Sequence, residues 1–221
     1  MNVAEAPDRL MPTIFIPHGG GPWPFMDESA FGGPGTWVGL RGYLEALGMS
    51  APEKPDAVLV VSAHWEAPVP TVQSSPQPSM LYDYYGFPAQ TYELQYPAPG
   101  APEWAARVRD LLESARIATA EDSQRGFDHG HFVPMMISFP EADVPTFQLS
   151  LKTGLDPLEH LRIGRALAPL RGENVLIVGS GMSYHNLRAF GRGGTGVESS
   201  SRAFDEWLAE TVAEDPSRRE T

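Results

Sequence analysis

Three histidines in this sequence follow apolar runs that are typical of buried β-strands, and they have the clearest potential for chemistry. The three runs cover residues 13–17, 57–63 and 174–179. His18 and His64 come directly after the first two runs, and His185 lies shortly after the third. In an open α/β sheet the carboxyl ends of the strands form the edge where ligands bind. We therefore expect the three to share one site, although any one alone is more often an ordinary loop or core residue.

Imidazole nitrogens bind zinc and iron, and they also transfer protons near neutral pH. The chain contains no Cys, so thiol nucleophiles, zinc ribbons and disulfides are excluded. Any metal must be held by His, Asp, Glu or carbonyl oxygen. The sequence has no HExxH motif, P-loop or G-x-S-x-G elbow. The histidines can therefore converge only through the tertiary fold.

The turn after the first strand has almost no side chains. It reads His18-Gly19-Gly20-Gly21-Pro22. Glycine adopts positive φ angles without steric cost and lets the backbone approach a neighbouring group closely. We expect this turn to bring backbone close to a ligand beside His18.

Other chemistry-bearing residues are weaker candidates. His129 lies between Asp128 and Gly130, and a nearby carboxylate can orient an imidazole or raise its pKa. The alternative for His129 is a solvated loop residue. Ser180, between two glycines, could be a nucleophile, but no local histidine–acid arrangement supports that role. His131 and His160 are still weaker candidates for a chemical role.

Composition limits the function classes. The 221 residues include 28 acidic and 16 basic side chains, a formal charge of −12 that disfavours nucleic acids and anionic membrane surfaces. Residues 1–11 contain acidic side chains and no apolar core of a signal peptide, and no apolar run is long enough to span a bilayer. We expect a soluble, cytoplasmic protein.

Apolar runs alternate with helical patterns along the chain, which predicts an α/β fold. A further strand is predicted at 144–150, and Gly126–His131 is predicted as a loop. Asp156-Pro157-Leu158-Glu159 has the pattern of a capping box with proline at the first helical position. Helices are predicted at 36–47, from 102, from 157, and at 198–214. We expect one α/β domain over residues 1–221, with a central, mostly parallel or mixed sheet flanked by helices.

Several short motifs, in order, give the sequence a family resemblance. It resembles the class III extradiol ring-cleavage dioxygenases of the LigB type, and within them the DOPA 4,5-dioxygenase-like branch. The motifs are Pro17–Pro22, Ser62–Trp65, Tyr85–Pro88, Tyr96–Gly100, Gly126–Gly130, Gln148–Ser150, Gly179–Gly181 and His185–Leu187. Each is modest alone, and their common order from residue 12 to about 190 makes the set specific.

The resemblance implies a central mixed sheet and a mononuclear non-haem metal, Fe(II) or in some members zinc, held by His18 and His64. It implies that His185 is a metal-site or acid–base residue, and that His129 lies beside the substrate. We expect His185 to bind metal as well as assist catalysis, and His129 to act in proton transfer. The family supplies one more histidine, in an H-x-x-P-L-like segment past the helix that ends near Glu214. The printed sequence contains no such segment.

The resemblance predicts the opening of a catechol-type ring by O2 next to the diol, as part of aromatic compound catabolism, without an organic cofactor. The expected partners are a small catechol and O2. One alternative is a non-catalytic metal-binding or scaffold homologue that has lost turnover together with the C-terminal histidine. Another is a zinc hydrolase, for which Asp128 or Glu66 would supply the base.

Overall fold

A computed structural model of the chain describes residues 10–27, 33–186 and 195–214. The chain divides into two compact units, the first reaching Gly181 and the second starting at Met182. The sheet and the helices up to η4 belong to the first unit. The expectation of one domain over residues 1–221 stays a prediction.

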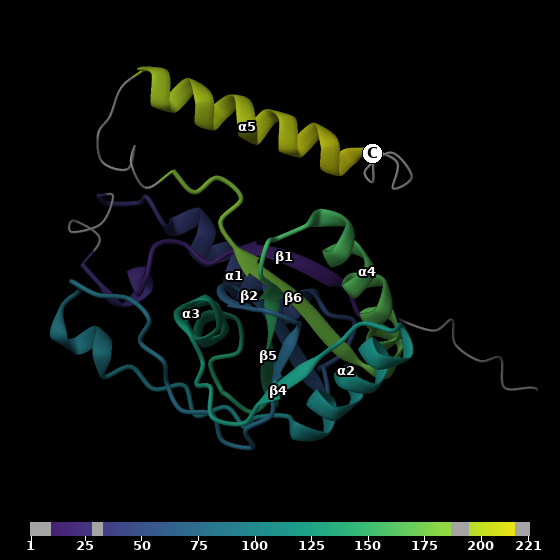
Figure 1. The fold of residues 1–221 in the computed structure, drawn as a ribbon. Helices are drawn as coiled ribbons and strands as arrows, with labels where there is room; N and C mark the ends of the chain where they lie inside the picture. The colour runs from purple at the N-terminus through teal and green to yellow at the C-terminus, as the bar shows by residue number, and fades with distance from the viewer. Residues whose placement is uncertain (1–9, 28–32, 187–194, 215–221) are drawn as a thin grey trace, which may run out of the picture. The chain divides into compact units, whose positions relative to one another are not determined.

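A six-stranded mixed sheet is the centre of the first unit (Figure 1). Its strands are β1 (Thr13–Pro17), β2 (Ala57–Ala67), β3 (Thr71–Gln73), β4 (Ala120–Asp122), β5 (Thr146–Lys152) and β6 (Val175–Gly181). The order across the sheet is β1-β6-β2-β5-β3-β4. The first four of these are mutually parallel, and β3 runs antiparallel to β5. The predicted α/β class with a mostly parallel or mixed sheet is confirmed, and the carboxyl ends of β1, β2 and β6 lie at one edge.

Helices cover both faces of this sheet. They are α1 (Val38–Ser50), α2 (Pro102–Ser114), α3 (His129–Ser138) and α4 (Pro157–Leu167), with 3-10 turns η1 (Trp23–Phe25), η3 (Ala89–Tyr92) and η4 (Ala168–Glu173). In Figure 1, α3 lies on one side of the sheet, and α2 and α4 lie on the other. Successive strand residues point to opposite faces. Val58 and Val60 therefore pack with α1 and α3, whereas Ala57 and Leu59 pack with α2 and α4.

Two helix starts show how local sequence sets these boundaries. The Asp156 carboxylate accepts a hydrogen bond from the backbone N–H of Glu159 at 2.9 Å, so the predicted cap of α4 is confirmed. The prediction of a loop over Gly126–His131 is wrong in its second half. Asp128 is the N-cap of α3 and accepts from the N–H of His131, so His129 begins the helix.

The second unit contains helix α5 (Thr195–Ala213), close to the predicted helix at 198–214. The ring of Phe204 contacts those of Tyr184 and Trp207, with centroids 5.5 Å apart in each pair. Among the helices that the structure describes, none combines the length and apolar character needed to cross a bilayer.

Candidate metal centre

Three imidazoles meet at the carboxyl edge of the parallel strands. His18 follows β1, His64 lies near the end of β2, and His129 begins α3. One ring nitrogen from each lies within 4.8 Å of those of the other two. Nε2 of His18 and Nε2 of His64 are only 3.0 Å apart. His18 and His129 are buried, whereas the side chain of His64 is 29% exposed to solvent.

Ser180 at the end of β6 fixes the tautomer of His18. Its hydroxyl donates a short hydrogen bond to the carbonyl oxygen of Gly130. A hydroxyl has one proton, so the same Oγ acts as acceptor toward Nδ1 of His18 at 3.0 Å. His18 therefore carries its proton on Nδ1 and directs the lone pair of Nε2 toward His64. Ser180 is a positioning group here, which agrees with the preference for a structural over a nucleophilic role.

Asp83 joins the other two imidazoles. Its Oδ1 accepts from the backbone N–H and from Nδ1 of His129, at 2.9 and 2.7 Å. Its Oδ2 lies 3.5 Å from Nδ1 of His64. Burial raises the pKa of Asp83, but the hydrogen bonds from His129 and the electrostatic interaction with His129 and His64 outweigh it and lower the pKa. The resulting carboxylate is hydrogen-bonded to Nδ1 of His129, which leaves Nε2 as the second nitrogen of that ring, and it also lies near Nδ1 of His64.

A break in strand pairing places His64. The register between β2 and β5 shifts between Ser62 and Glu66, so the intervening residues leave the regular ladder. Such bulges turn a side chain out of its regular strand direction. Gly130 packs directly against this segment, because a Cβ on it would lie 2.7 Å from Oγ of Ser62 and 3.0 Å from Cδ2 of His64.

Asp128 is fully buried and stabilises the β2 segment that carries His64. One carboxylate oxygen accepts from Ser62 Oγ at 2.7 Å, and the other accepts from Gln148 Nε2 at 2.7 Å and Arg125 at 2.9 Å. The Arg125 guanidinium also lies over the ring of Trp65, 4.4 Å from its centroid. Both carboxylate oxygens are occupied by these partners, so Asp128 has a structural role here.

The glycine turn next to His18 is closed by aromatic rings. Gly19 and Gly21 adopt φ angles of +76° and +54°, and a Cβ on either would overlap Trp23 or Phe87 respectively. The Trp23 indole N–H donates to the carbonyl oxygen of His18 at 2.8 Å. The expected close approach at this turn therefore exists, and its partners in the structure are aromatic side chains of the chain itself.

The pair formed by His18 and His64 fits one metal ion. Two nitrogen ligands at about 2.0–2.1 Å from the same ion lie roughly 3 Å apart, which matches the 3.0 Å between the Nε2 atoms of His18 and His64. Nδ1 of His18 is bound to Ser180 and Nδ1 of His64 lies 3.5 Å from Asp83, so with both protons on Nδ1 the two Nε2 lone pairs point to each other. Two such lone pairs repel unless a cation lies between them. Outer partners that fix the tautomer in this way are typical of metal-binding histidines.

The remaining predicted residues are placed differently. His185 lies in the second unit, so its predicted role in metal binding and catalysis stays a prediction. His131 is fully buried and stacks on Phe127, with centroids 4.0 Å apart. His160 accepts from the backbone N–H of Lys152 at 3.1 Å and makes a 2.8 Å bond to the Asp156 carbonyl oxygen. Both have structural partners away from the cluster.

Sequence reasoning missed two residues that organise the site, Asp83 and Arg125. Asp83 lies in the connection between β3 and η3. Its one sequence signal is that it stands two residues before the Tyr85–Pro88 motif. Arg125 directly precedes the Gly126–Gly130 motif. Neither position has a strand or helix pattern that could have linked it to a histidine.

The chain is similar to several known proteins. Residues 22–219 match the family model described as the catalytic LigB subunit of aromatic ring-opening dioxygenase. The chain is 39% identical to "Dioxygenase tasH" of Hapsidospora irregularis, over 94% of this chain and 68% of that protein. It is 44% identical to "4,5-DOPA dioxygenase extradiol" of Portulaca grandiflora, over 74% of this chain and 60% of that protein.

A solved structure, of an uncharacterised protein from Escherichia coli K12, has the same fold. The TM-score is 0.63 and the identity 34%, and the match covers 80% of this chain and 67% of that one. The chain thus spans about two thirds of the length of these relatives. On the family match over nearly its whole length, it belongs to the LigB family of aromatic ring-opening dioxygenases.

Proposed function

We propose that this chain is an extradiol dioxygenase that opens the ring of a catechol-type substrate with O2 at a mononuclear Fe(II). The observation that carries the proposal is the pair of Nε2 atoms of His18 and His64, 3.0 Å apart, in a member of the LigB family. Zinc has no redox chemistry, so a reaction with O2 favours iron. Several relatives are named 4,5-DOPA dioxygenase extradiol, and a 3,4-dihydroxyphenyl substrate is therefore the first to test.

His18 and His64 are the proposed metal ligands in the first unit, and His185 is proposed as a further ligand. His129 is better suited to proton transfer. The three ligand atoms of the cluster spread over up to 4.8 Å. Two ligands at about 2.1 Å from one ion cannot be more than roughly 4.2 Å apart. The three nitrogens therefore do not all fit around one ion as they stand, and the 3.0 Å pair fits best.

When bound, the metal supplies open coordination positions at which a catechol and O2 are brought together. The protein's part is to move the catechol protons. Asp83 holds the Nδ1 proton of His129 at 2.7 Å, which leaves Nε2 as the second nitrogen of that ring. This nitrogen can accept a phenolic proton, and the Asp83 carboxylate stabilises the imidazolium that results. The same proton can then return from Nε2 as the ring opens.

The test is aerobic turnover after anaerobic loading with Fe(II). We expect O2 consumption and a yellow product with at least one catechol of a panel that includes DOPA. His64→Ala should abolish this activity, whereas His160→Ala, the same substitution on α4 away from the cluster, should retain it. A chain that binds Fe(II) with normal stoichiometry but turns over none of the panel would favour a metal-binding homologue without catalysis.

A further inference from the structure

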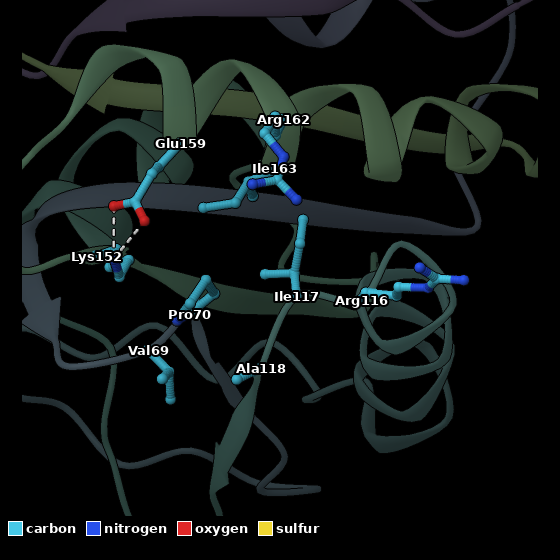
Figure 2. Close-up of a pocket in the computed structure, with 9 residues that line it drawn as sticks. All are labelled: Val69, Pro70, Arg116, Ile117, Ala118, Lys152, Glu159, Arg162 and Ile163. Carbon is cyan, nitrogen blue, oxygen red and sulfur yellow. Dashed lines mark hydrogen bonds and ion pairs between the residues drawn. The ribbon is translucent and has the colours of Figure 1, made fainter.

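A pocket lies beside α4 and shares no residue with the histidine cluster. It has a volume of about 220 Å³ and is formed by the turn between β2 and β3, the segment between α2 and β4, the end of β5, and α4 (Figure 2). Its lining residues are Val69, Pro70, Arg116, Ile117, Ala118, Lys152, Glu159, Arg162 and Ile163. No residue of the proposed catalytic machinery contributes to it.

The lining combines an apolar floor with an excess of positive charge. Pro70 and Ile163 are buried, and Val69 and Ile117 are partly buried. Three cationic side chains and one carboxylate line the pocket, which gives it a formal charge of +2. The whole chain carries −12. A local excess of positive charge in so acidic a protein attracts anions by ordinary electrostatics.

The charges are not equally available to a ligand. The Lys152 ammonium is held by both oxygens of Glu159, at 2.6 and 2.5 Å, so this pair is satisfied within the protein. In the part of the chain that the structure describes, the guanidinium groups of Arg116 and Arg162 have no hydrogen-bond or ion-pair partner. By contrast, Arg107 and Arg109 bind carboxylates.

Figure 2 shows how the two arginines lie. The Arg162 side chain turns toward Ile117, so its guanidinium lies next to the apolar floor. Arg116 lies at the rim, and its guanidinium extends away from the pocket. A guanidinium binds a carboxylate through two parallel hydrogen bonds. Arg162 is therefore placed to take the charged end of a ligand whose apolar body rests on Pro70, Ile117 and Ile163.

We propose that this pocket is a binding site for a small carboxylate with an apolar body about the size of one aromatic ring. The volume of 220 Å³ equals that of about seven waters at roughly 30 Å³ each, which is room for such a molecule. Arg162 binds the carboxylate, Arg116 adds charge at the rim, and the apolar floor selects against a bare inorganic anion. This site is separate from the metal centre, and its test does not depend on catalysis.

Benzoate is the ligand for the experiment, added to the ¹⁵N-labelled full chain while backbone amide shifts are recorded. We expect saturable shifts at the amides of Ile117, Ala118 and Ile163. Arg162→Gln should weaken binding at least tenfold, whereas Lys54→Gln, which removes the same charge outside the pocket, should leave it unchanged. Ala118→Glu places a carboxylate on an exposed rim position and should abolish binding in a chain that is still folded.

Two further ligands separate charge from shape. Benzamide has the same ring without the charge and should bind at least tenfold more weakly than benzoate, as should inorganic phosphate, which has charge without the ring. If benzamide bound as tightly as benzoate, the pocket would not be an anion site. If phosphate bound as tightly as benzoate, the pocket would not select for an apolar body. Absence of saturable shifts at these amides up to the solubility limit of benzoate would overturn the proposal. Persistence of the shifts in His64→Ala is expected, because the pocket is independent of the metal centre.

Discussion

Asp83→Asn is the substitution that tests how the histidines are held. The amide retains an oxygen that can accept from the backbone N–H of His129, now 2.9 Å from Oδ1, but it loses the negative charge shared by two imidazoles. Outer partners of metal-binding histidines typically contribute about 10–100-fold in affinity or activity. The contact to His64, a proposed ligand, is long at 3.5 Å, whereas the contact to His129 is 2.7 Å.

These distances set different magnitudes for metal binding and for turnover. We expect Asp83→Asn to weaken metal binding by about tenfold, which is roughly 1.4 kcal/mol. Turnover should fall further, by about 100-fold, because the charge that stabilises protonated His129 is lost. The dissociation constant is measured by competition with a chromophoric chelator, and turnover by O2 consumption in metal-saturated protein.

Asp143→Asn is the matched control, because Asp143 pairs with Lys54 on an exposed part of the surface. It should change neither quantity. If Asp83→Asn behaved like Asp143→Asn in both assays, the assignment of Asp83 as the shared support of His64 and His129 would be refuted.

Three other perturbations give distinct expectations. Burial lowers the pKa of His131 from its ordinary value of 6.5 to about 3. The stability that this neutral imidazole contributes is therefore fully present above pH 6.5 and is lost as the pH falls toward 3. Its share of the free energy of unfolding should drop by about 2 kcal/mol between pH 7 and 5. In urea unfolding, the free energy of unfolding of His131→Phe should therefore fall by about 2 kcal/mol less than that of the wild type over this range. An equal fall in both proteins would contradict the burial argument. His129→Ala should leave the metal bound and lower turnover by about 10²–10⁴-fold, whereas His185→Ala should lower both metal content and turnover. Elemental analysis and turnover assays measure the two quantities. The reverse pattern would mean that His129 is the metal ligand and His185 the proton-transfer residue. Gly130→Ala should reduce metal affinity because its Cβ would press on the β2 side chains beside it, whereas Gly164→Ala on α4, with no atom within 4 Å of the new Cβ, should not; chelator competition on both variants compares them.

The fold was predictable where apolar runs are long. The strands β1, β2, β5 and β6 each carry five or more residues of mostly apolar or β-branched character, and these were predicted within a few residues of their ends. The strands β3 and β4 have three residues each, too few for a periodic signal, and depend on pairing with each other and with β5. Helix α3 was not predicted, because Gly130 and two histidines resemble a loop and only the Asp128 cap marks its start.

The candidate site was predictable to the extent that it follows strand ends. His18 and His64 stand directly after apolar runs, so their convergence follows from parallel pairing of β1 and β2 through β6. Asp83 comes from a loop with no such pattern, and its place beside His64 and His129 is determined only by tertiary packing. The support that Ser180 gives to His18 is of the same kind, since the two residues are 162 positions apart in sequence.

The metal content of His18→Ala and His64→Ala is the most direct test of the central claim, that these two imidazoles hold one metal ion. Wild type, both variants and His160→Ala would be loaded with Fe(II) without air, desalted, and measured by elemental analysis. We predict about one iron per chain in wild type and in His160→Ala, and loss of most of it in the other two. Unchanged stoichiometry in both His18→Ala and His64→Ala would contradict the account.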